Sequence, residues 1–305
     1  LLTFADMRAV SASIWTEWNA MLLWELYMRT LKFLQGQTDR LKLDEVYAQV
    51  SRLIGSTVGD EAITWHFDTM PEQELMSKTP ELISKQIQLV EELGDKPITV
   101  SCFDESHMHT QIGICTRDAR GIFRQITGVL ATEQINILSA EIDTRKDGIV
   151  IDVLNVTEEH TDSAPQGIST ERCGKISEIL TTLWKVEPDR ETQFLESMMH
   201  QLNMPIFPAH VHRRNVPPEI HIDNDGSDRA TIIDIRAPDR VGLLYAISNA
   251  FFELGLDIRI AKITTEAFTA VDSFYVTEEN GEKITDSDRI KILQKALEEL
   301  LKFDN

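Results

Sequence analysis

Apolar residues recur at three- and four-residue steps through residues 1–97, a spacing that is typical of helices. The run over 14–33 carries so wide an apolar stripe that the helix it predicts must be mostly buried. Two further helices are predicted over 43–54 and 82–93. The second of these follows Pro80, a residue that favours the first turn of a helix. The first third of the chain is therefore expected to be helical.

Beyond these helices the pattern becomes strand-like and helix-like in turn, and it occurs twice. The segment Asp118-Ala-Arg-Gly121 returns 121 residues later as Asp239-Arg-Val-Gly242. Both segments follow an apolar strand-like run and open an apolar helix-like one. The spacing drops by one residue between two later strand-like runs, where a hairpin turn tolerates the change. Two long copies indicate a tandem pair of domains and not a solenoid.

Each copy predicts strand, helix, strand, strand and helix in that order. In the first copy, a strand near 98–101 precedes elements expected at 111–116, 122–130, 135–144, 149–156 and 176–184. In the second copy, the elements are expected at 231–237, 243–254, 256–265, 270–276 and 290–301. No strand follows the last helix, so the second sheet is either one strand short or completed by 219–222, which we favour. The pattern predicts an α+β protein whose helical N-terminal segment precedes two ferredoxin-like (βαββαβ) domains.

Composition narrows the function classes. The 305-residue chain has a formal net charge of −20, from 30 basic and 50 acidic residues, which argues against binding to nucleic acid or an anionic membrane. No apolar run approaches the roughly 18 residues of a membrane helix. Three isolated cysteines without paired spacing, Cys102, Cys115 and Cys173, fit a reduced cytoplasmic protein better than a disulfide scaffold. The chain starts at Leu1 within an apolar run, which suggests a piece of something longer.

The repeated corner has the chemistry of an amino-acid site. A strand that turns at glycine into a helix offers free backbone amides, which suit a carboxylate. Asn136 and Asp257 open the next strand in each copy, which a split ferredoxin-like arrangement places beside the helix start of that copy, and they offer an acceptor for an ammonium group. Alternatively, the glycine only ends a strand and the aspartate only caps a helix. The candidate ligand-binding residues are Asp239, Arg240, Gly242, Leu243, Asp257 and Ile258, with Asp118, Gly121, Ile122 and Asn136 in the first copy.

These residues carry a family resemblance. The second copy reads Ala-Pro-Asp-Arg-Val-Gly-Leu-Leu-Tyr at 237–245, Leu-Asp-Ile-Arg-Ile-Ala-Lys-Ile-Thr-Thr at 256–265 and Val-Asp-Ser-Phe-Tyr-Val-Thr at 271–277. It resembles the terminal ACT domain of the bifunctional uridylyltransferase/uridylyl-removing enzymes that modify nitrogen regulatory protein PII. The first copy, Thr-Arg-Asp-Ala-Arg-Gly-Ile-Phe at 116–123, is similar to that family's penultimate ACT domain. It departs from the pattern at Arg120, where the family usually has proline.

The N-terminal segment resembles the end of the same family's HD-type hydrolase domain. By that resemblance, Asp6 matches the last metal-ligating aspartate of the HD site. No histidine of the chain is followed by aspartate, so the other ligands are missing. The resemblance gives the segments 1–35 (end of the HD domain), 36–97 (helical linker), 98–186 (first ACT domain), 187–218 (connector) and 219–305 (second ACT domain).

The motif for nucleotidyl transfer is also missing. The family needs a Gly-Ser turn followed by paired acids that hold Mg²⁺ and phosphates. Gly55-Ser56 followed by Asp60-Glu61 is the only candidate, and adjacent acids point apart instead of converging. We interpret residues 55–59 as a loop. No cofactor is expected in this chain, whereas the parent enzyme is expected to need Mg²⁺ or another divalent metal.

The resemblance implies that the chain senses an amino acid, glutamine in this family, and biases upstream catalytic domains that act on PII. No uridylyl transfer or removal is expected from this chain alone. ACT domains commonly pair through sheet edges, so side-by-side packing within the chain or in a homodimer is expected, with the site at that junction. The alternatives are a stand-alone ACT-repeat regulator that binds an amino acid and an assembly module without catalysis.

Overall fold

The computed structural model describes residues 39–106, 109–158, 166–186, 194–195, 197, 217–266 and 269–302. The chain divides into two compact units, residues 1–84 and 85–305. The segment 1–35, including Asp6 and the helix expected at 14–33, lies outside the described residues, as does most of the connector 187–218.

The described part of the first unit is helical. It contains α3 (Asp39–Ile54), α4 (Asp60–Thr69), α5 (Glu72–Ser77) and the start of α6 (Pro80–Leu93). The helices expected at 43–54 and 82–93 are thus confirmed, and residues 55–59 form the turn between α3 and α4. The backbone N–H of Leu82 donates to Oγ1 of Thr79 over 3.3 Å, which caps α6. The two short helices α4 and α5 were missed because neither carries a long apolar period.

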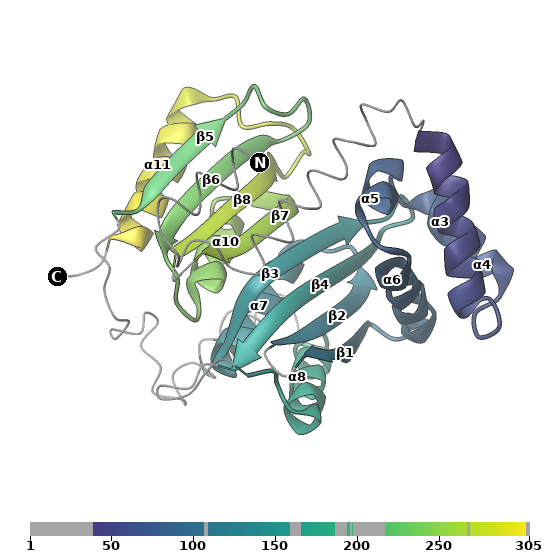
Figure 1. Ribbon diagram of the computed structural model, residues 1–305. Helices are drawn as coiled ribbons and strands as arrows, with labels where there is room; N and C mark the ends of the chain where they lie inside the picture. Colours follow the sequence, from purple (N-terminus) through teal and green to yellow (C-terminus); the bar gives the residue numbers. More distant parts are fainter. Residues whose placement is uncertain are drawn as a thin grey trace, which may run out of the picture. The chain divides into compact units, whose positions relative to one another are not determined.

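The second unit holds both copies of the repeat (Figure 1). The first copy consists of β1 (Ile98–Ser106), β2 (His109–Arg117), α7 (Ile122–Thr132), β3 (Ile135–Thr144), β4 (Ile149–Glu158) and α8 (Thr170–Leu183). The second consists of β5 (Glu219–Asp223), β6 (Thr231–Pro238), α10 (Leu243–Glu253), β7 (Leu256–Glu266), β8 (Thr269–Glu278) and α11 (Ser287–Leu301).

The strands of both copies form one eight-stranded sheet in the order β1-β2-β4-β3-β7-β8-β6-β5. The copies meet where β3 pairs antiparallel with β7, at Ser139 opposite Thr264 and Ala140 opposite Ile263. The ferredoxin-like class is confirmed, but the order within each copy is ββαββα and not the expected βαββαβ. In each copy, the additional strand comes before the others in the chain: β1 pairs with β2, and β5 pairs with β6. The prediction that residues 219–222 complete the second sheet is therefore confirmed.

One apolar core runs through both copies and includes residues of α7, α8, α10 and α11. Helix α7 is buried along its whole length because it packs against β3, α8 and α10. Gly128 permits the close approach of α10, since a β-carbon there would lie 3.0 Å from the ring of Tyr245. At the same crossing, Oγ1 of Thr127 and Oγ of Ser248 share a buried hydrogen bond of 3.1 Å. The packing expected between the copies therefore occurs within one chain.

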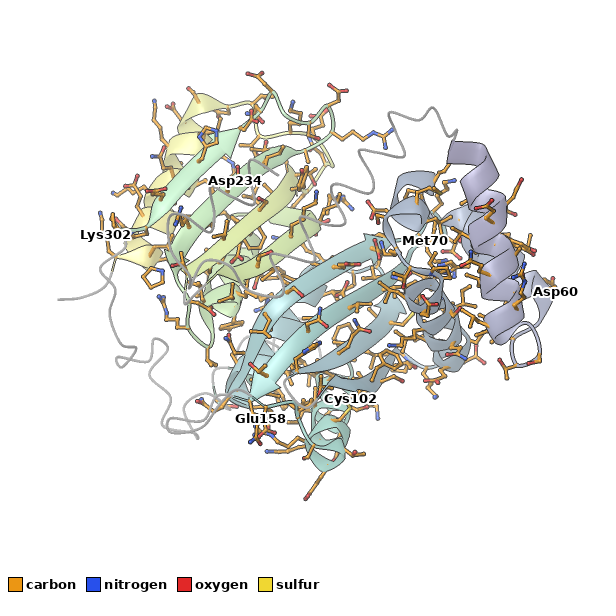
Figure 2. The ribbon with its side chains drawn as sticks, viewed as in Figure 1. Asp60, Met70, Cys102, Glu158, Asp234 and Lys302 are labelled. Carbon is orange, nitrogen blue, oxygen red and sulfur yellow. A yellow bond between two sulfur atoms is a disulfide. The ribbon has the colours of Figure 1, made fainter. Side chains whose placement is uncertain are left out.

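The expectation of three isolated cysteines is wrong for two of them. Cys102 of β1 and Cys173 of α8 form a disulfide, with their Cα atoms 6.3 Å apart (Figure 2). They are 71 residues apart in sequence, and no local spacing marks them as a pair. They meet because α8 packs against β1. Cys115 is free and buried, and burial raises the pKa of its thiol to about 12.

Candidate functional site

The two Asp-x-x-Gly corners adopt the same backbone conformation. Gly121 precedes α7 with φ +82° and Gly242 precedes α10 with φ +83°, both in the left-handed region. A residue with a β-carbon pays roughly 1–2 kcal/mol there, which explains glycine at both positions. The glycines are the N-caps and provide no side-chain cap. The first turn of a helix has backbone amides without a partner inside the helix, which a carboxylate site requires. In α10 the first of them, the N–H of Leu243, donates to the Arg240 carbonyl over 3.1 Å, so a carboxylate there has to use the amides that follow Leu243.

Two pockets lie at the junction of the copies, and each takes residues from both. Site 1 is lined by Asp118, Ala119, Gly121, Ile122, Phe123, Arg124, Ile142, Thr144, Val150, Asp152, Ser248, Phe252, Leu256, Asp257 and Ile258. Site 2 is lined by Thr127, Ala131, Ile135, Asn136, Ile137, Asp239, Arg240, Gly242, Leu243, Leu244, Tyr245, Ile263, Thr265, Ala270 and Asp272. All ten predicted ligand-binding residues fall in these two sets, and their binding role stays a prediction.

The partners are exchanged between the copies, which corrects the expected pairing. We expected Asn136 beside the corner of its own copy, and Asp257 likewise. Instead, Asn136 lies in site 2 with Asp239, and Asp257 lies in site 1 with Asp118.

Strand direction explains the exchange. The corner at Asp118 follows Arg117, which pairs with Ile149 of β4, and Val150 of β4 pairs with Thr144 at the end of β3. The start of β3 is therefore at the far end of its own sheet. Because β7 runs antiparallel to β3, its first residues come to the end of β3 instead.

Site 2 is internally hydrogen-bonded. The carboxylate of Asp239 accepts from Nδ2 of Asn136 at 3.1 Å and from Oγ1 of Thr265 at 3.0 Å. Burial raises the pKa of Asp239, and these hydrogen bonds oppose the rise. Behind it, Asp272 accepts from the backbone N–H of Thr264 at 3.3 Å, and burial raises the pKa of its carboxyl to about 8. Burial lowers the pKa of Arg240, and neighbouring Asp239 opposes that change.

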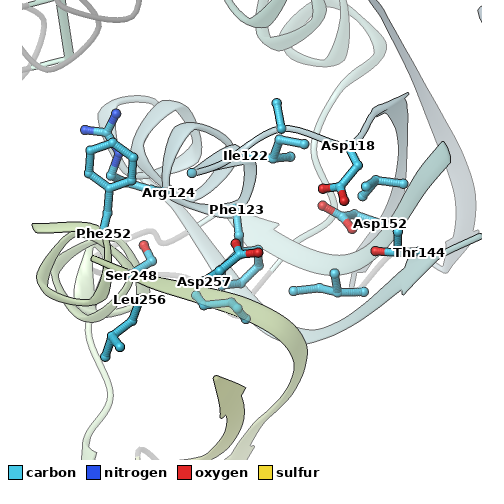
Figure 3. Close-up of a pocket in the computed structure, with 15 residues that line it drawn as sticks. Asp118, Ile122, Phe123, Arg124, Thr144, Asp152, Ser248, Phe252, Leu256 and Asp257 are labelled. Carbon is cyan, nitrogen blue, oxygen red and sulfur yellow. The ribbon is translucent and has the colours of Figure 1, made fainter. Parts of the chain in front are cut away.

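Site 1 has an equivalent arrangement of residues but contains more carboxyl groups than site 2. Asp152, which corresponds to Asp272, is 1% exposed, and neither of its oxygens has a hydrogen-bond partner in the described structure. Burial raises its pKa well above the usual value, and the negative charges of Asp143 and Asp118 add to the rise. Burial also raises the pKa of Asp257, whose carboxylate lies 3.3 Å from the guanidinium of Arg259. Figure 3 shows Asp118 and Asp152 turned toward each other, with Asp257 apart from them.

The two sites also differ in the side chain that packs against the corner glycine. A β-carbon at Gly121 would come within 2.9 Å of the ring of Phe252, whereas one at Gly242 would lie 3.8 Å from Ala131. Arg120 stacks on the Phe252 ring at 4.5 Å and donates to the Phe252 carbonyl at 2.7 Å. It also pairs with Glu279 at 2.6 Å. Arg120, the residue at which the first copy departs from the family pattern, thus links the first corner to the second copy.

The sequence did not lead us to the buried acids Asp152 and Asp272 or to Phe252, whose ring packs against Gly121. Asp152 and Asp272 share the spacing of 120 residues and stand as single charges within apolar strands, a signal that was available. Phe252 carried no such signal, because its role depends on the other copy. Among the described residues, no group of three or more His, Cys, Asp or Glu side chains is placed to hold a metal ion. None of the described helices has the length and apolarity to cross a bilayer.

The described fold agrees with comparisons to known proteins. Residues 226–303 match the model of the ACR family N-terminal ACT domain, and residues 110–164 match that of the ACT domain. The chain contains two ACT domains. A solved chain described as the crystal structure of aspartate kinase from Synechocystis matches 64% of this chain and 28% of its own length, with 16% sequence identity and a TM-score of 0.32.

The relatives are bifunctional uridylyltransferase/uridylyl-removing enzymes. The ACT-domain chain is 29% identical to that of Gluconobacter oxydans and covers 31% of it, with 97% of this chain aligned. Identity is 29% to the Bradyrhizobium diazoefficiens enzyme and 30% to that of Azospirillum brasilense, over 100% and 97% of this chain and 32% of each relative. The chain spans about a third of the relatives' length. The resemblance expected from its motifs is confirmed.

Proposed function

We propose that this chain is the regulatory, amino-acid-sensing portion of a PII uridylyltransferase/uridylyl-removing enzyme. The observation that carries the proposal is the composition of the two sites, each of which takes residues from both ACT domains. A ligand in either site contacts both domains at once. It therefore favours the docked arrangement of the pair over any arrangement in which the domains separate. Such a difference in affinity between two states is what an allosteric effector requires.

Glutamine at site 2 is the proposed ligand. Its α-carboxylate would accept hydrogen bonds from the amides that follow Leu243 in the first turn of α10. Its ammonium would approach the carboxylate of Asp239, which Asn136 holds in place from the other domain. The identity of the amino acid is proposed from the similarity to the uridylyltransferase/uridylyl-removing enzymes. The binding mode is proposed from the positions of Gly242, Asp239 and Asn136.

The similarity to these enzymes also supports a proposal for what the bound ligand regulates. We infer that the ligand signal passes to catalytic domains elsewhere in the parent protein, which act on PII and use Mg²⁺ or another divalent metal. A cytoplasmic location is proposed with it, because nucleotide-dependent modification takes place where nucleotides are. The Cys102–Cys173 disulfide is uncommon in that compartment, so the thiol state of the chain taken from cells tests the location.

Calorimetric titration of the purified chain with L-glutamine tests the function. We expect saturable heat, and Asp239→Asn should weaken binding at least tenfold because it removes the negative charge that faces the ammonium. Asp118→Asn, the same change in site 1, is the matched control and should leave glutamine affinity within about twofold. No heat at millimolar glutamine from the folded chain would leave the assembly-module alternative ahead. Any uridylyl transfer or removal by the chain alone would contradict the assignment to a regulatory portion.

A further inference from the structure

Site 1 contains a buried acid that makes no hydrogen bond to any residue that the structure describes. Asp152 is 1% exposed, lines the pocket, and has no hydrogen-bond partner on either oxygen among the described residues. Buried polar groups without partners are rare and commonly mark a missing ligand or ion. The charged groups that act on Asp152 are Asp143 and Asp118, and both are negative. A cation in the pocket would therefore relieve two unfavourable terms at once, desolvation and repulsion.

Comparison with site 2 shows what is missing. There, the side-chain amide of Asn136 donates to Asp239 over 3.1 Å. At the place of Asn136, site 1 has Asp257, which lacks the side-chain amide and, when ionised, cannot donate. Asp118 therefore lacks the amide donor that its counterpart Asp239 has. The exchange of one amide for one acid turns a self-satisfied corner into one that needs a donor from outside.

The basic residues nearby are engaged elsewhere. The Arg259 guanidinium lies 3.3 Å from Asp257. Arg120 pairs with Glu279, and the Arg124 guanidinium stacks 4.2 Å above the Phe252 ring. Asp143 lies on β3 beside Ile142, the residue opposite Asp152, so its side chain points to the other face of the sheet and accepts a hydrogen bond from Nε2 of Gln86 at 2.9 Å. These contacts leave the carboxyl groups of Asp118 and Asp152 without a basic partner among the described residues that line site 1.

We propose that site 1 binds an amino acid that carries a second ammonium group on its side chain, such as lysine, and that this ammonium lies between Asp118 and Asp152. The α-carboxylate meets the first amides of α7, and the α-ammonium faces Asp257, which Figure 3 places apart from the acid pair. Site 2 takes an uncharged side chain. The inference rests on the proposed function, because it takes both corners as amino-acid sites.

A matched ligand pair tests the charge directly. L-lysine and L-norleucine have the same carbon chain and differ in the terminal ammonium. Titrated into the full chain near pH 7, lysine should bind at least tenfold more tightly than norleucine. Asp152→Asn should reduce lysine affinity at least tenfold and leave glutamine affinity within about twofold. Asp272→Asn, the same substitution in site 2, should leave lysine affinity within about twofold.

Both variants used in this test are expected to fold. Asparagine at 152 keeps the shape of the neutral carboxyl, and Asp118→Asn provides a second variant at the pocket wall, outside the strands. Equal affinities for lysine and norleucine would overturn the proposal, as would a lysine preference that survives both substitutions. If glutamine binds but lysine does not, only this inference fails. If neither binds the folded chain, the proposed function fails with it.

Discussion

The side-chain amide of Asn136 in the first ACT domain donates a hydrogen bond to the carboxylate of Asp239 in the second, across 3.1 Å. The contact joins the start of β3 to the turn that opens α10. Because the reciprocal site takes Asp257 from the second domain and Asp118 from the first, neither domain contains a whole pocket. Docking of the domains and formation of the sites are therefore one equilibrium, and each can be measured through the other.

Replacing Asn136 by aspartate tests this coupling. The variant loses an amide donor and places a second carboxylate beside Asp239, so we expect a loss of about 1–3 kcal/mol in the free energy of unfolding. The loss should grow as pH rises and both acids ionise. Urea denaturation at about pH 5 and pH 8 measures it. Asp257→Asn makes the opposite change in site 1 and should not destabilise. A loss for Asn136→Asp that is the same at both pH values would contradict the reason given.

Asp272 should make stability depend on pH in a defined direction. Burial raises its pKa from 3.8 to about 8 in the folded chain, so the folded state keeps a proton that the unfolded state has lost. The contribution of Asp272 to the free energy of unfolding therefore falls as pH rises between about 4 and 8, and is constant on either side of this range. Asp272→Asn stays neutral and should be more stable than the parent at pH 8, with the difference closing toward pH 4.

Unfolding of both chains across this pH range measures the effect. The exposed residue Asp228, changed to asparagine, is the control for loss of one charge at the surface. A difference between Asp272→Asn and the parent that widens toward pH 4 has the wrong sign and would exclude a neutral Asp272 in the folded state.

The elements themselves could be predicted because their causes are local. Strands such as β8 alternate between buried and less buried positions, and α7 and α10 follow a glycine that their corner requires. The pairing of β5 with the second sheet was predicted from the strand count, because no strand follows the last helix and residues 219–222 could replace it.

The partners within each site could not be predicted in the same way. Spacing places Asn136 at the start of a strand, but it does not say which corner that strand approaches. That depends on the antiparallel pairing of β3 with β7, of which only Ser139 with Thr264 and Ala140 with Ile263 are in register contact. Long-range pairing of this kind leaves no local pattern. The Cys102–Cys173 disulfide escaped notice for the same reason.

Thiol counting tests that disulfide. The chain has three cysteines, and Cys115 is buried with its thiol pKa raised to about 12, so the folded chain should show no rapidly reacting thiol. After denaturation one thiol should react, and after reduction three. Replacing both Cys102 and Cys173 by serine should cost about 2–5 kcal/mol of stability, by urea denaturation without reductant. Three reactive thiols in denatured, unreduced chain purified under air would show that the bond does not form.

The two corner glycines should respond unequally to alanine. Gly242→Ala carries the strain of a left-handed backbone, about 1–2 kcal/mol, and its β-carbon makes an ordinary van der Waals contact 3.8 Å from Ala131. Gly121→Ala carries the same strain and also drives its β-carbon to 2.9 Å from the ring of Phe252, which adds roughly 1–3 kcal/mol of overpacking. Urea denaturation should therefore rank Gly121→Ala as the more destabilised variant.

A double-mutant cycle identifies the cause of that difference. Phe252→Ala should rescue part of the cost of Gly121→Ala, with a coupling of at least about 1 kcal/mol, because it removes the ring that the new methyl group meets. The same change combined with Gly242→Ala should be additive within about 0.5 kcal/mol, since Gly242 faces Ala131 instead. Equal costs for the two glycines, or equal coupling of both to Phe252, would mean that Phe252 does not cover the first corner in solution.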